Sequence, residues 1–227
     1  MARSTRVTTV FTKQPEAGLV KTRLVPLLGA TRAAELALAM LDDTVQKCVG
    51  ESSFETVLCV APDTAIAWFE ARYPEIARVV PQIGSQLGER MAQRFDDEFA
   101  CGDRTIVALG SDAPHTPIEW TIEVHERLER GADVVLGLDD GGGYHTIGLK
   151  RSVPQLFRDV PMSTADMGER TVNLARSMGL VVEFIPSSFD IDVPPDLKRL
   201  RDLLTSDPEV GARLPRTNQA LRSLPEL

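Results

Sequence analysis

The sequence has few cysteines and no long hydrophobic run, and both features narrow the class of protein. Its 227 residues include three cysteines without a CxxC pair, which argues against a disulfide framework and against a zinc site. We expect Cys48, Cys59 and Cys101 to be small buried hydrophobes in a reducing compartment. No stretch of 18 apolar residues occurs, so no membrane span is expected. The first residues lack the apolar segment of a signal peptide, and a cytoplasmic location is therefore expected.

Several catalytic motifs are also missing. The sequence contains no HExxH, no GxSxG, no Walker A motif and no GxGxxG, which argues against a zinc protease, an α/β-hydrolase, a P-loop enzyme and a Rossmann dehydrogenase. The three histidines share no spacing. We expect His125 on the exposed face of a helix, whereas His145, beside a glycine-rich loop, is a candidate substrate contact.

The charges that are present are unevenly distributed. The chain carries 25 Lys and Arg against 33 Asp and Glu, a net charge of -8 with a pI near 5.0, which argues against a nucleic-acid partner. Residues 1–32 nevertheless sum to +5, which leaves -13 for the remainder. A basic opening on an acidic chain indicates a local anion-binding site. A solvated surface would give the same count.

Strand and helix patterns alternate along the whole chain. The expected strands are 6–12, 56–60, 78–81, 105–110, 133–138, 144–149 and 180–185, and the expected helices are 31–49, 64–73, 87–101, 117–130, 166–178 and 194–204. This order predicts a single α/β domain over residues 1–227, with helices on both faces of a mostly parallel sheet. Residues 205–227 are expected to be irregular or a helical extension. Ligands of such sheets bind at the carboxyl ends of the strands.

A cationic loop follows the first expected strand. It contains Lys13, Gly18, Lys21 and Arg23. Lysine and arginine neutralise phosphate oxygens, and glycine allows the backbone to approach a ligand closely. The loop is therefore a candidate phosphate site, with an ordinary charged surface loop as the alternative.

Carboxylates follow two later segments. Asp112 comes directly after strand 105–110, where it could bind Mg²⁺ or Mn²⁺ or could cap the next turn. Asp190 and Asp192 lie two positions apart in an extended segment, so they face the same side and could complete a metal site with Asp112. Asp192 could equally be the N-cap of the helix that starts near Pro194.

A third segment, residues 139–144, reads Asp-Asp-Gly-Gly-Gly-Tyr. Asp-Gly is a strong hairpin signal, so a turn between two strands is expected. The two carboxylates are also candidates for metal or base roles.

These segments, taken together, resemble the DUF2064 proteins. Those are GT-A-like proteins related in fold to nucleotidyltransferases such as the molybdenum-cofactor guanylyltransferase and phospholactate guanylyltransferase. The matching motifs occur in family order over roughly residues 6–204, and they are Lys13-x-Pro15-x-x-Gly18-x-Val20-Lys21-Thr22-Arg23-Leu24, Leu41-Asp42-Asp43-Thr44, Gln82 with Leu87-Gly88-Glu89-Arg90-Met91, Gly110-Ser111-Asp112-x-Pro114, Gly142-Gly143-Tyr144, Ser163-Thr164 and Asp190-Ile191-Asp192-x-Pro194.

The resemblance implies a three-layer α/β/α GT-A-like fold and assigns roles to particular residues. It implies that Lys13, Lys21 and Arg23 face the phosphates of a nucleotide, that Leu87 and Gly88 border its base and ribose, and that Asp112 and Asp192 bind Mg²⁺ or Mn²⁺. Lys21 and Asp112 are then the expected catalytic residues, and Asp42 braces the first loop. Gly18 and Ser111 are further expected nucleotide contacts, and the expected substrate contacts are Gly142, Gly143, Tyr144, Ser163 and Thr164.

The sequence departs from the family at two positions. Gly141 stands where the family has Asp, which makes Asp140, one residue earlier, the candidate catalytic residue, with Asp139 as the other possible substitute. Met162 stands where the family commonly has Trp.

Three functions fit these expectations. The first is a metal-dependent glycosyltransferase with a nucleotide-sugar donor, which the family label favours. The second is a nucleotidyltransferase acting on an NTP and a phosphorylated small molecule, which the cationic loop suits because a triphosphate carries more charge. The third is a degenerate nucleotide-binding protein, suggested by Gly141. In each case the partners are a nucleotide or nucleotide-sugar and, for the enzymes, a small-molecule acceptor; the sequence indicates no particular oligomeric state.

Overall fold

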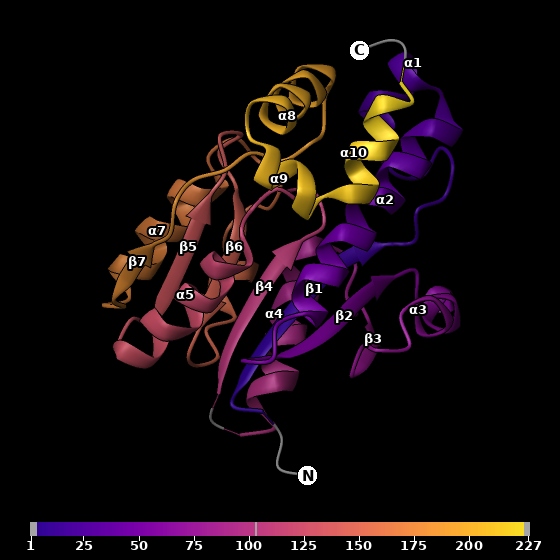
Figure 1. Cartoon of the computed structure of the whole chain (residues 1–227). Helices are drawn as coiled ribbons and strands as arrows, with labels where there is room; N and C mark the ends of the chain where they lie inside the picture. Colours follow the sequence, from indigo (N-terminus) through magenta and orange to yellow (C-terminus); the bar gives the residue numbers. More distant parts are fainter. Residues whose placement is uncertain (1–3, 103, 225–227) are drawn as a thin grey trace.

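One seven-stranded sheet organises the computed structural model, which describes residues 4–102 and 104–224 (Figure 1). Strand β6 is antiparallel to its neighbours β4 and β5, and all other pairs are parallel, so the expected mixed, mostly parallel sheet is confirmed. Across the sheet the order is β3 (Arg78–Pro81), β2 (Glu55–Ala61), β1 (Arg6–Lys13), β4 (Thr105–Gly110), β6 (Tyr144–Leu149), β5 (Val134–Leu138) and β7 (Val182–Phe184).

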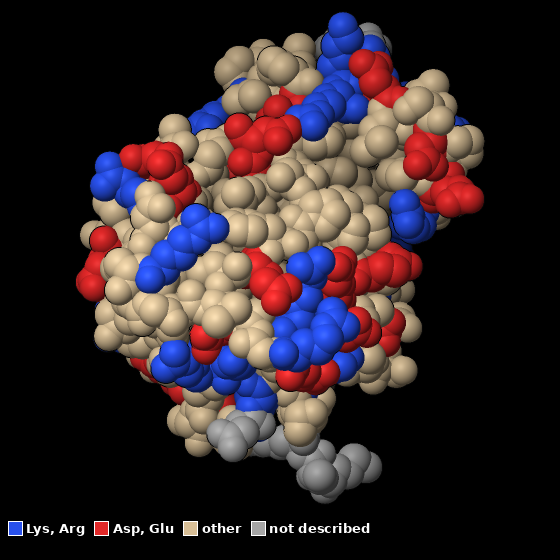
Figure 2. All heavy atoms as spheres, turned by 90° about the vertical axis from the view of Figure 1, so that its left-hand side faces the viewer, with Lys and Arg blue, Asp and Glu red and all other residues tan. Residues whose placement is uncertain are grey.

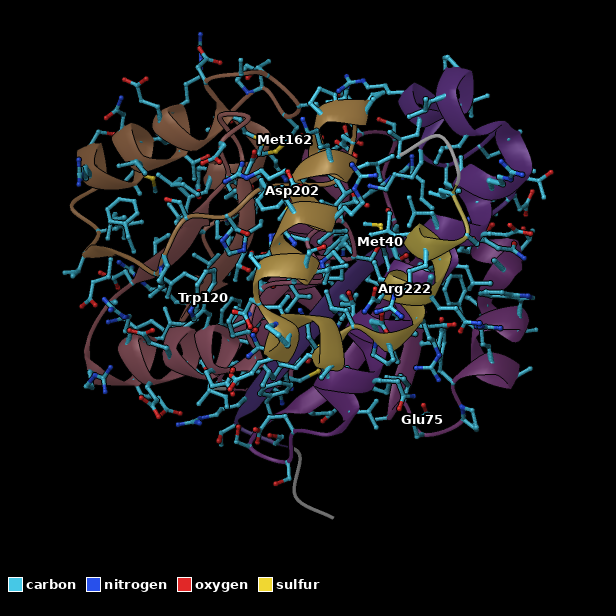
Figure 3. The ribbon with its side chains drawn as sticks, turned by 45° about the horizontal axis from the view of Figure 1, so that its top comes forward. Met40, Glu75, Trp120, Met162, Asp202 and Arg222 are labelled. Carbon is cyan, nitrogen blue, oxygen red and sulfur yellow. The ribbon has the colours of Figure 1, made fainter. Side chains whose placement is uncertain are left out.

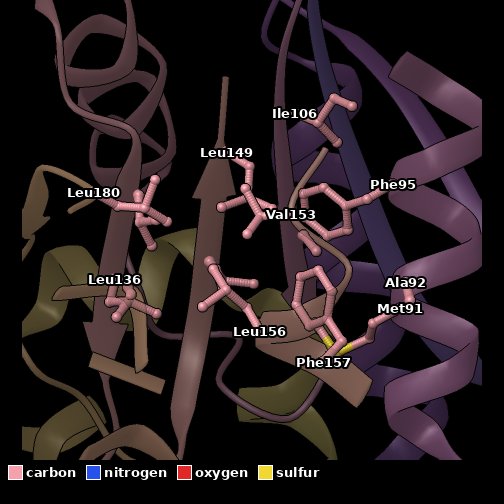
Figure 4. Close-up of a cluster of buried hydrophobic side chains, with 14 of the residues drawn as sticks. Met91, Ala92, Phe95, Ile106, Leu136, Leu149, Val153, Leu156, Phe157 and Leu180 are labelled. Carbon is pink, nitrogen blue, oxygen red and sulfur yellow. The ribbon is translucent and has the colours of Figure 1, made fainter. Parts of the chain in front are cut away.

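Helices cover both faces of the sheet, which makes the three layers that were expected. Helices α2 (Ala30–Val49), α3 (Ile66–Arg72) and α5 (Ile118–Arg130) pack on one face. Helices α4 (Leu87–Phe99), α6 (Gln155–Arg158) and α7 (Met167–Ser177) pack on the other. Figure 4 shows the core on this second face, where the rings of Phe95 and Phe157 stack with centroids 5.0 Å apart.

Strand β4 shows why the sequences of the central strands are almost entirely apolar. Ile106 and Ala108 face the α4 side, whereas Val107 and Leu109 face the other side. Successive side chains of a strand point to opposite faces, and both faces of this sheet are covered. Every expected strand and helix is present, with ends shifted by at most two residues.

The C-terminal segment is helical in its described part, so of the two expectations the irregular one was wrong. After α8 (Pro194–Ser206), the chain forms α9 (Pro208–Arg213) and α10 (Pro215–Arg222), each with Pro in its first turn. Helix α10 packs on α2, where the Asp43 carboxylate accepts hydrogen bonds from the backbone N–H groups of Arg216 (3.3 Å) and Thr217 (2.8 Å). Residues 225–227 of the expected extension lie outside the described residues.

Three short elements were not predicted, because each is only three or four residues long. They are the 3-10 turn η1 (Thr22–Leu24), which contains Arg23 of the cationic loop, α1 (Val25–Leu28) directly after it, and α6. The 3-10 turn η2 (Asp63–Ala65) overlaps the start of the expected helix 64–73.

Two predictions of burial were wrong. His125 is fully buried rather than exposed, since its ring nitrogens lie 3.0 Å from Thr8 Oγ1 and 2.7 Å from Thr105 Oγ1 on the underlying strands. Burial lowers the pKa of His125 to about 3. Cys48 and Cys59 are buried as expected, but Cys101, just past the end of α4, is exposed.

The surface carries charges of both signs. On the face that bears β7, acidic and basic side chains are interspersed around a broad area without charged groups (Figure 2). Among the described residues, no helix has the length and apolar character needed to cross a membrane.

Candidate functional site

The topology places a pocket where the ends of β1 and β4 meet. After β1 the chain builds β2 and β3 on one side, whereas β4 lies on the other side of β1. Such a switch point leaves a crevice beyond the carboxyl ends of the two strands. The β1–β4 pocket has a volume of about 380 Å³. Its walls are formed by Phe11, Thr12, Lys13, Pro15, Leu19, Val20, Lys21, Thr22, Ala37, Gln82, Leu87, Gly110, Ser111, Asp112 and Asp192.

Lys21 forms ion pairs with two carboxylates in this pocket. Its ammonium Nζ lies 3.0 Å from Asp192 Oδ1 and also contacts Asp112 Oδ1. The Lys21 side chain is 5% exposed, whereas the two carboxylates are about half exposed. Burial alone would lower the pKa of Lys21, but the charges of Asp112 and Asp192 outweigh it and raise that pKa. Lys21 is therefore a cation whose position is fixed by the two carboxylates.

Backbone contacts explain how two distant aspartates meet. The N–H of Ile191 donates to the carbonyl of Asp112 at 2.9 Å, which joins the segment before α8 to the end of β4. Asp196 Oδ2 accepts from the N–H groups of Asp192 (2.9 Å) and Val193 (2.8 Å). Asp196 thus satisfies the start of α8, and the Asp192 side chain is left for Lys21 rather than serving as the N-cap.

Asp190 is a further carboxyl group near this pocket. Burial, followed by the nearby charges of Asp112, Asp139 and Asp192, raises the pKa of Asp190 to about 7. Asp190 is half-buried and does not line the β1–β4 pocket. That it completes a metal site with Asp112 and Asp192 stays a prediction.

The residues of this pocket fit a divalent cation that is also bound by substrate phosphates. Mg²⁺ is commonly held by one or two carboxylates, with substrate phosphates and water completing the shell. Asp112 and Asp192 supply two carboxylates that already converge on one cationic atom, Lys21 Nζ. No group of three or more His, Cys, Asp and Glu side chains placed to hold a metal occurs among residues 4–102 and 104–224. The site therefore suits a cation that arrives with phosphates and shares the two carboxylates with Lys21.

Three further residues of the pocket wall, Lys13, Leu87 and Ser111, belong to the expected nucleotide site. Lys13 is exposed at the end of β1, and Ser111 Oγ lies 3.4 Å from Thr12 Oγ1 across the two strands. Leu87, the first residue of α4, is 39% exposed. Gln82, a residue of the matching motifs, also lines the pocket. Its Nε2 donates to the carbonyls of Thr12 (2.9 Å) and Cys59 (3.0 Å), which fastens the ends of β1 and β2.

Three predicted nucleotide contacts lie outside the pocket walls. Gly18 is exposed on the loop with φ +82°, and Arg23 is exposed on η1. Gly88 is buried against α6, where a Cβ would lie 2.1 Å from the carbonyl oxygen of Phe157. Packing of α4 on α6 therefore accounts for a glycine at position 88.

The expected hairpin turn joins β5 to β6, and its glycines serve packing. Asp139 closes the turn, because its carboxylate accepts hydrogen bonds from the N–H groups of Gly141 and Gly143, the latter at 2.9 Å. Gly142 has φ +89°, and a Cβ there would lie 1.7 Å from the carbonyl oxygen of Ala165. Neither Gly142 nor Gly143 lines the β1–β4 pocket.

Asp140, the expected catalytic substitute, forms an ion pair outside the β1–β4 pocket. Its carboxylate pairs with Arg199 at 2.6 Å, and both side chains are about half exposed. It does not line the β1–β4 pocket. Asp42 does not brace the first loop; it accepts hydrogen bonds from Arg72 and from the Tyr73 hydroxyl (2.6 Å), so it fixes α3 to α2.

A second, apolar pocket adjoins the first. This methionine pocket has a volume of about 120 Å³. It is lined by Phe11, Leu87, Met91, Ala108, Leu109, Gly110, Tyr144, His145, Met162 and Met167. Tyr144 thus faces a pocket, as a substrate contact would, whereas Ser163 and Thr164 are exposed on the loop before α7 and line neither pocket. Figure 3 turns this end of the molecule forward and labels Met162.

Comparisons with solved structures agree with this architecture. A crystal structure from Desulfovibrio desulfuricans G20, of a protein whose proposed activity is nucleotide-diphospho-sugar transfer, superposes with a TM-score of 0.85 at 28% identity, covering 97% of this chain and 98% of that one. A cytidylyltransferase from Leptospira borgpetersenii gives a TM-score of 0.58 at 11% identity, with coverage of 97% and 98%. A 4-diphosphocytidyl-2C-methyl-D-erythritol synthase gives 0.56 at 14%, with coverage of 90% and 99%. The fold is that of the nucleotide-diphospho-sugar transferases, as the sequence resemblance implied.

Comparison of the amino-acid sequence with known families shows the family to which the chain belongs. The family model DUF2064, described as an uncharacterized protein conserved in bacteria, matches residues 44–164. The chain belongs to the DUF2064 family. It is also similar to a phosphoenolpyruvate guanylyltransferase of Sphaerobacter thermophilus, with 28% identity over 184 residues that cover 79% of this chain and 86% of that protein. The similarity to a guanylyltransferase favours nucleotidyl transfer over glycosyl transfer, which the family label had favoured.

Proposed function

We propose that this protein is a nucleotidyltransferase, which transfers a nucleoside monophosphate from an NTP to a phosphorylated small molecule. The observation that carries the proposal is the position of Lys21 between Asp112 and Asp192 in the β1–β4 pocket. A buried cation beside two accessible carboxylates is a suitable arrangement for phosphate groups that bind with a divalent cation.

In the proposed reaction, a phosphate oxygen of the acceptor attacks the α-phosphorus of the NTP. One P–O bond forms between acceptor and α-phosphate, the bond between the α-phosphorus and the bridging oxygen breaks, and pyrophosphate leaves with that oxygen. Lys21 and Lys13 face the phosphates and stabilise the charge that develops on the leaving pyrophosphate. Asp112 and Asp192 would hold Mg²⁺ or Mn²⁺, which supplies charge neutralisation to the phosphates when it is bound.

Two observations support nucleotidyl transfer over glycosyl transfer. The curated relative from Sphaerobacter thermophilus is named for guanylyl transfer. In addition, Lys13 and Lys21 both line the pocket, and two cations match a triphosphate better than a diphosphate. Glycosyl transfer by the same residues would stabilise a departing nucleoside diphosphate instead.

The proposal is tested by product analysis with purified protein, Mg²⁺ or Mn²⁺, the four NTPs and a panel of phosphorylated acceptors. We expect pyrophosphate release that depends on the acceptor. Asp112→Asn should abolish it, whereas Asp159→Asn, at an exposed aspartate outside both pockets, should not. Release of nucleoside diphosphate from nucleotide-sugars, without pyrophosphate, would establish the glycosyltransferase reaction instead.

The degenerate alternative gives a third result. It predicts metal-dependent nucleotide binding without any turnover across the acceptor panel. The feature that suggested it, Gly141, lies in a turn whose geometry is fixed by Asp139, so the missing family carboxylate does not disrupt the hairpin.

A further inference from the structure

We infer that the acceptor carries a short, uncharged apolar group that binds in the methionine pocket. This inference rests on the proposed nucleotidyl transfer and narrows its acceptor to small phosphorylated molecules with an aliphatic segment of about four or five carbon atoms.

The first support is continuity between the two pockets. Phe11, Leu87 and Gly110 form part of the walls of both. Gly110 ends β4 and is followed by Ser111 and Asp112, which line only the β1–β4 pocket. A molecule whose phosphate lies near Asp112 can therefore place an adjoining group in the methionine pocket.

The second support is size. An apolar cavity of about 150 Å³ holds a benzene molecule, and the methionine pocket has about 120 Å³. A purine base is larger than benzene and does not fit, and a pyrimidine base, although it is of benzene size, carries several polar groups that these apolar walls would leave without partners. A chain of four or five carbon atoms fits, and methionine side chains adapt well to such irregular contents.

The third support is the chemistry of the pocket walls. No Lys or Arg, and no Asp or Glu, is among the residues that line it. His145 is its one imidazole, and both ring nitrogens have partners, at 2.9 Å from Thr146 Oγ1 and 3.3 Å from the Pro186 carbonyl oxygen. Burial lowers the pKa of His145, which favours the neutral ring. A carboxylate in this pocket would lose its hydration without gaining a cationic partner.

Tyr144 supplies the fourth observation. Tyr144 is half-buried, and the partners of its hydroxyl in the structure are two thioether sulfurs, Met91 Sδ and Met162 Sδ, each at 3.9 Å. Sulfur is a weak acceptor. A hydroxyl with such partners can donate instead to an oxygen of an acceptor whose apolar group fills the pocket, and this places the polar and apolar ends of the ligand.

The experiment titrates the full-length protein, labelled with ¹³C at the methionine methyl groups, with n-butyl phosphate, methyl phosphate and phosphoenolpyruvate. Mg²⁺ and a non-hydrolysable NTP analogue are present throughout. We expect n-butyl phosphate to shift the resonances of Met91, Met162 and Met167 saturably and to leave those of Met40 and Met178 in place. Each buried methylene contributes about fourfold in affinity, so n-butyl phosphate should bind at least tenfold more tightly than methyl phosphate.

Two variants complete the test. Met162→Trp fills the pocket from a half-buried position and should remove the advantage of n-butyl over methyl phosphate. Met178→Trp makes the same change at an exposed position near the end of α7 and should preserve that advantage.

The outcomes separate this inference from the proposed function. Equal affinities for the three phosphates, or tighter binding of phosphoenolpyruvate, overturn the inference, and so does a titration with n-butyl phosphate that leaves the resonances of Met91, Met162 and Met167 in place. Pyrophosphate release with charged acceptors would still sustain nucleotidyl transfer in that event. Binding of n-butyl phosphate in the pocket without turnover of any acceptor would overturn nucleotidyl transfer and leave the ligand class of the pocket in place.

Discussion

Lys21 and Asp192 lie 171 positions apart in the sequence, and their Nζ and Oδ1 atoms are 3.0 Å apart in the fold. The ion pair joins the loop after β1 to the segment before α8. Lys21 reaches it from a left-handed backbone conformation with φ +46°, which is uncommon for a residue with a side chain. Strained backbone of this kind occurs at functional sites, and here it directs the lysine into the β1–β4 pocket.

Removal of the lysine should weaken nucleotide binding. Lys21→Ala loses charge-assisted contacts to phosphate, each of which contributes about 1.5–3 kcal/mol, so the Kd for the NTP should rise by roughly 10- to 150-fold. Isothermal titration calorimetry measures the change. Lys198→Ala, at an exposed lysine on α8, is the matched control and should bind normally. An unchanged Kd for Lys21→Ala would show that the cationic loop is an ordinary charged surface loop and not a phosphate site.

Two aspartates four positions apart should have opposite effects. Asp192→Asn should weaken the Mg²⁺ dependence of NTP binding with little change in the free energy of unfolding. Asp196→Ala removes the acceptor of two N–H groups at the start of α8 and should cost about 1 kcal/mol of stability. Urea unfolding and Mg²⁺ titrations of both variants distinguish the roles, and the account is wrong if Asp192 proves the structural residue.

Asp42, which the resemblance placed as a brace of the first loop, should matter to stability through α3. Its 7%-exposed carboxylate accepts from Arg72 and from the Tyr73 hydroxyl. Asp42→Ala leaves the Tyr73 hydroxyl and a guanidinium without this acceptor, which should cost about 2–3 kcal/mol. Chemical denaturation checks the value. Tyr73→Phe removes one of these partners and should cost less.

Stability should fall as the pH drops below about 6.5. Burial lowers the pKa of His115 and of His125 to about 3 each, so both stay neutral in the fold but take up protons in the unfolded chain. Each histidine therefore binds about one more proton in the unfolded state and removes about 1.4 kcal/mol per pH unit between 6.5 and 3. Asp190 acts in the opposite sense, because its pKa is raised to about 7 in the fold, and it offsets about one of the two histidines over this range. Urea unfolding between pH 7.5 and 5 measures the slope. His125→Gln should reduce it by about one proton; an identical slope would show that His125 titrates normally in the fold.

Much of the fold could be predicted because the sequence patterns are strong. The apolar run of β4 and the helical spacing of α2 depend on burial of local segments, which periodicity records directly. The position of His125 could not be predicted in this way, because its burial depends on hydroxyl partners, Thr8 and Thr105, on two other elements. The short α6 is too brief for any periodicity to emerge.

The candidate site was predicted in part for a similar reason. Lys21, Asp112 and Asp192 were each identified from local context, and the structure brings all three together. The partner of Asp140 could not be read from the sequence, since Arg199 comes from α8, 59 positions away. The methionine pocket was missed because its walls come from β1, β4, β6, α4, α7 and the segment before α7, and only the fold assembles them.

The most direct test of nucleotidyl transfer follows the α-phosphate itself. The protein is incubated with Mg²⁺, an NTP labelled with ³²P at the α-phosphorus, and n-butyl phosphate or another phosphorylated acceptor, and the products are separated. The account predicts that the label moves into a new diphosphate-linked product as unlabelled pyrophosphate is released, and that Asp112→Asn prevents this. Label that stays in the NTP with every acceptor, while the nucleotide binds in a metal-dependent manner, would contradict it.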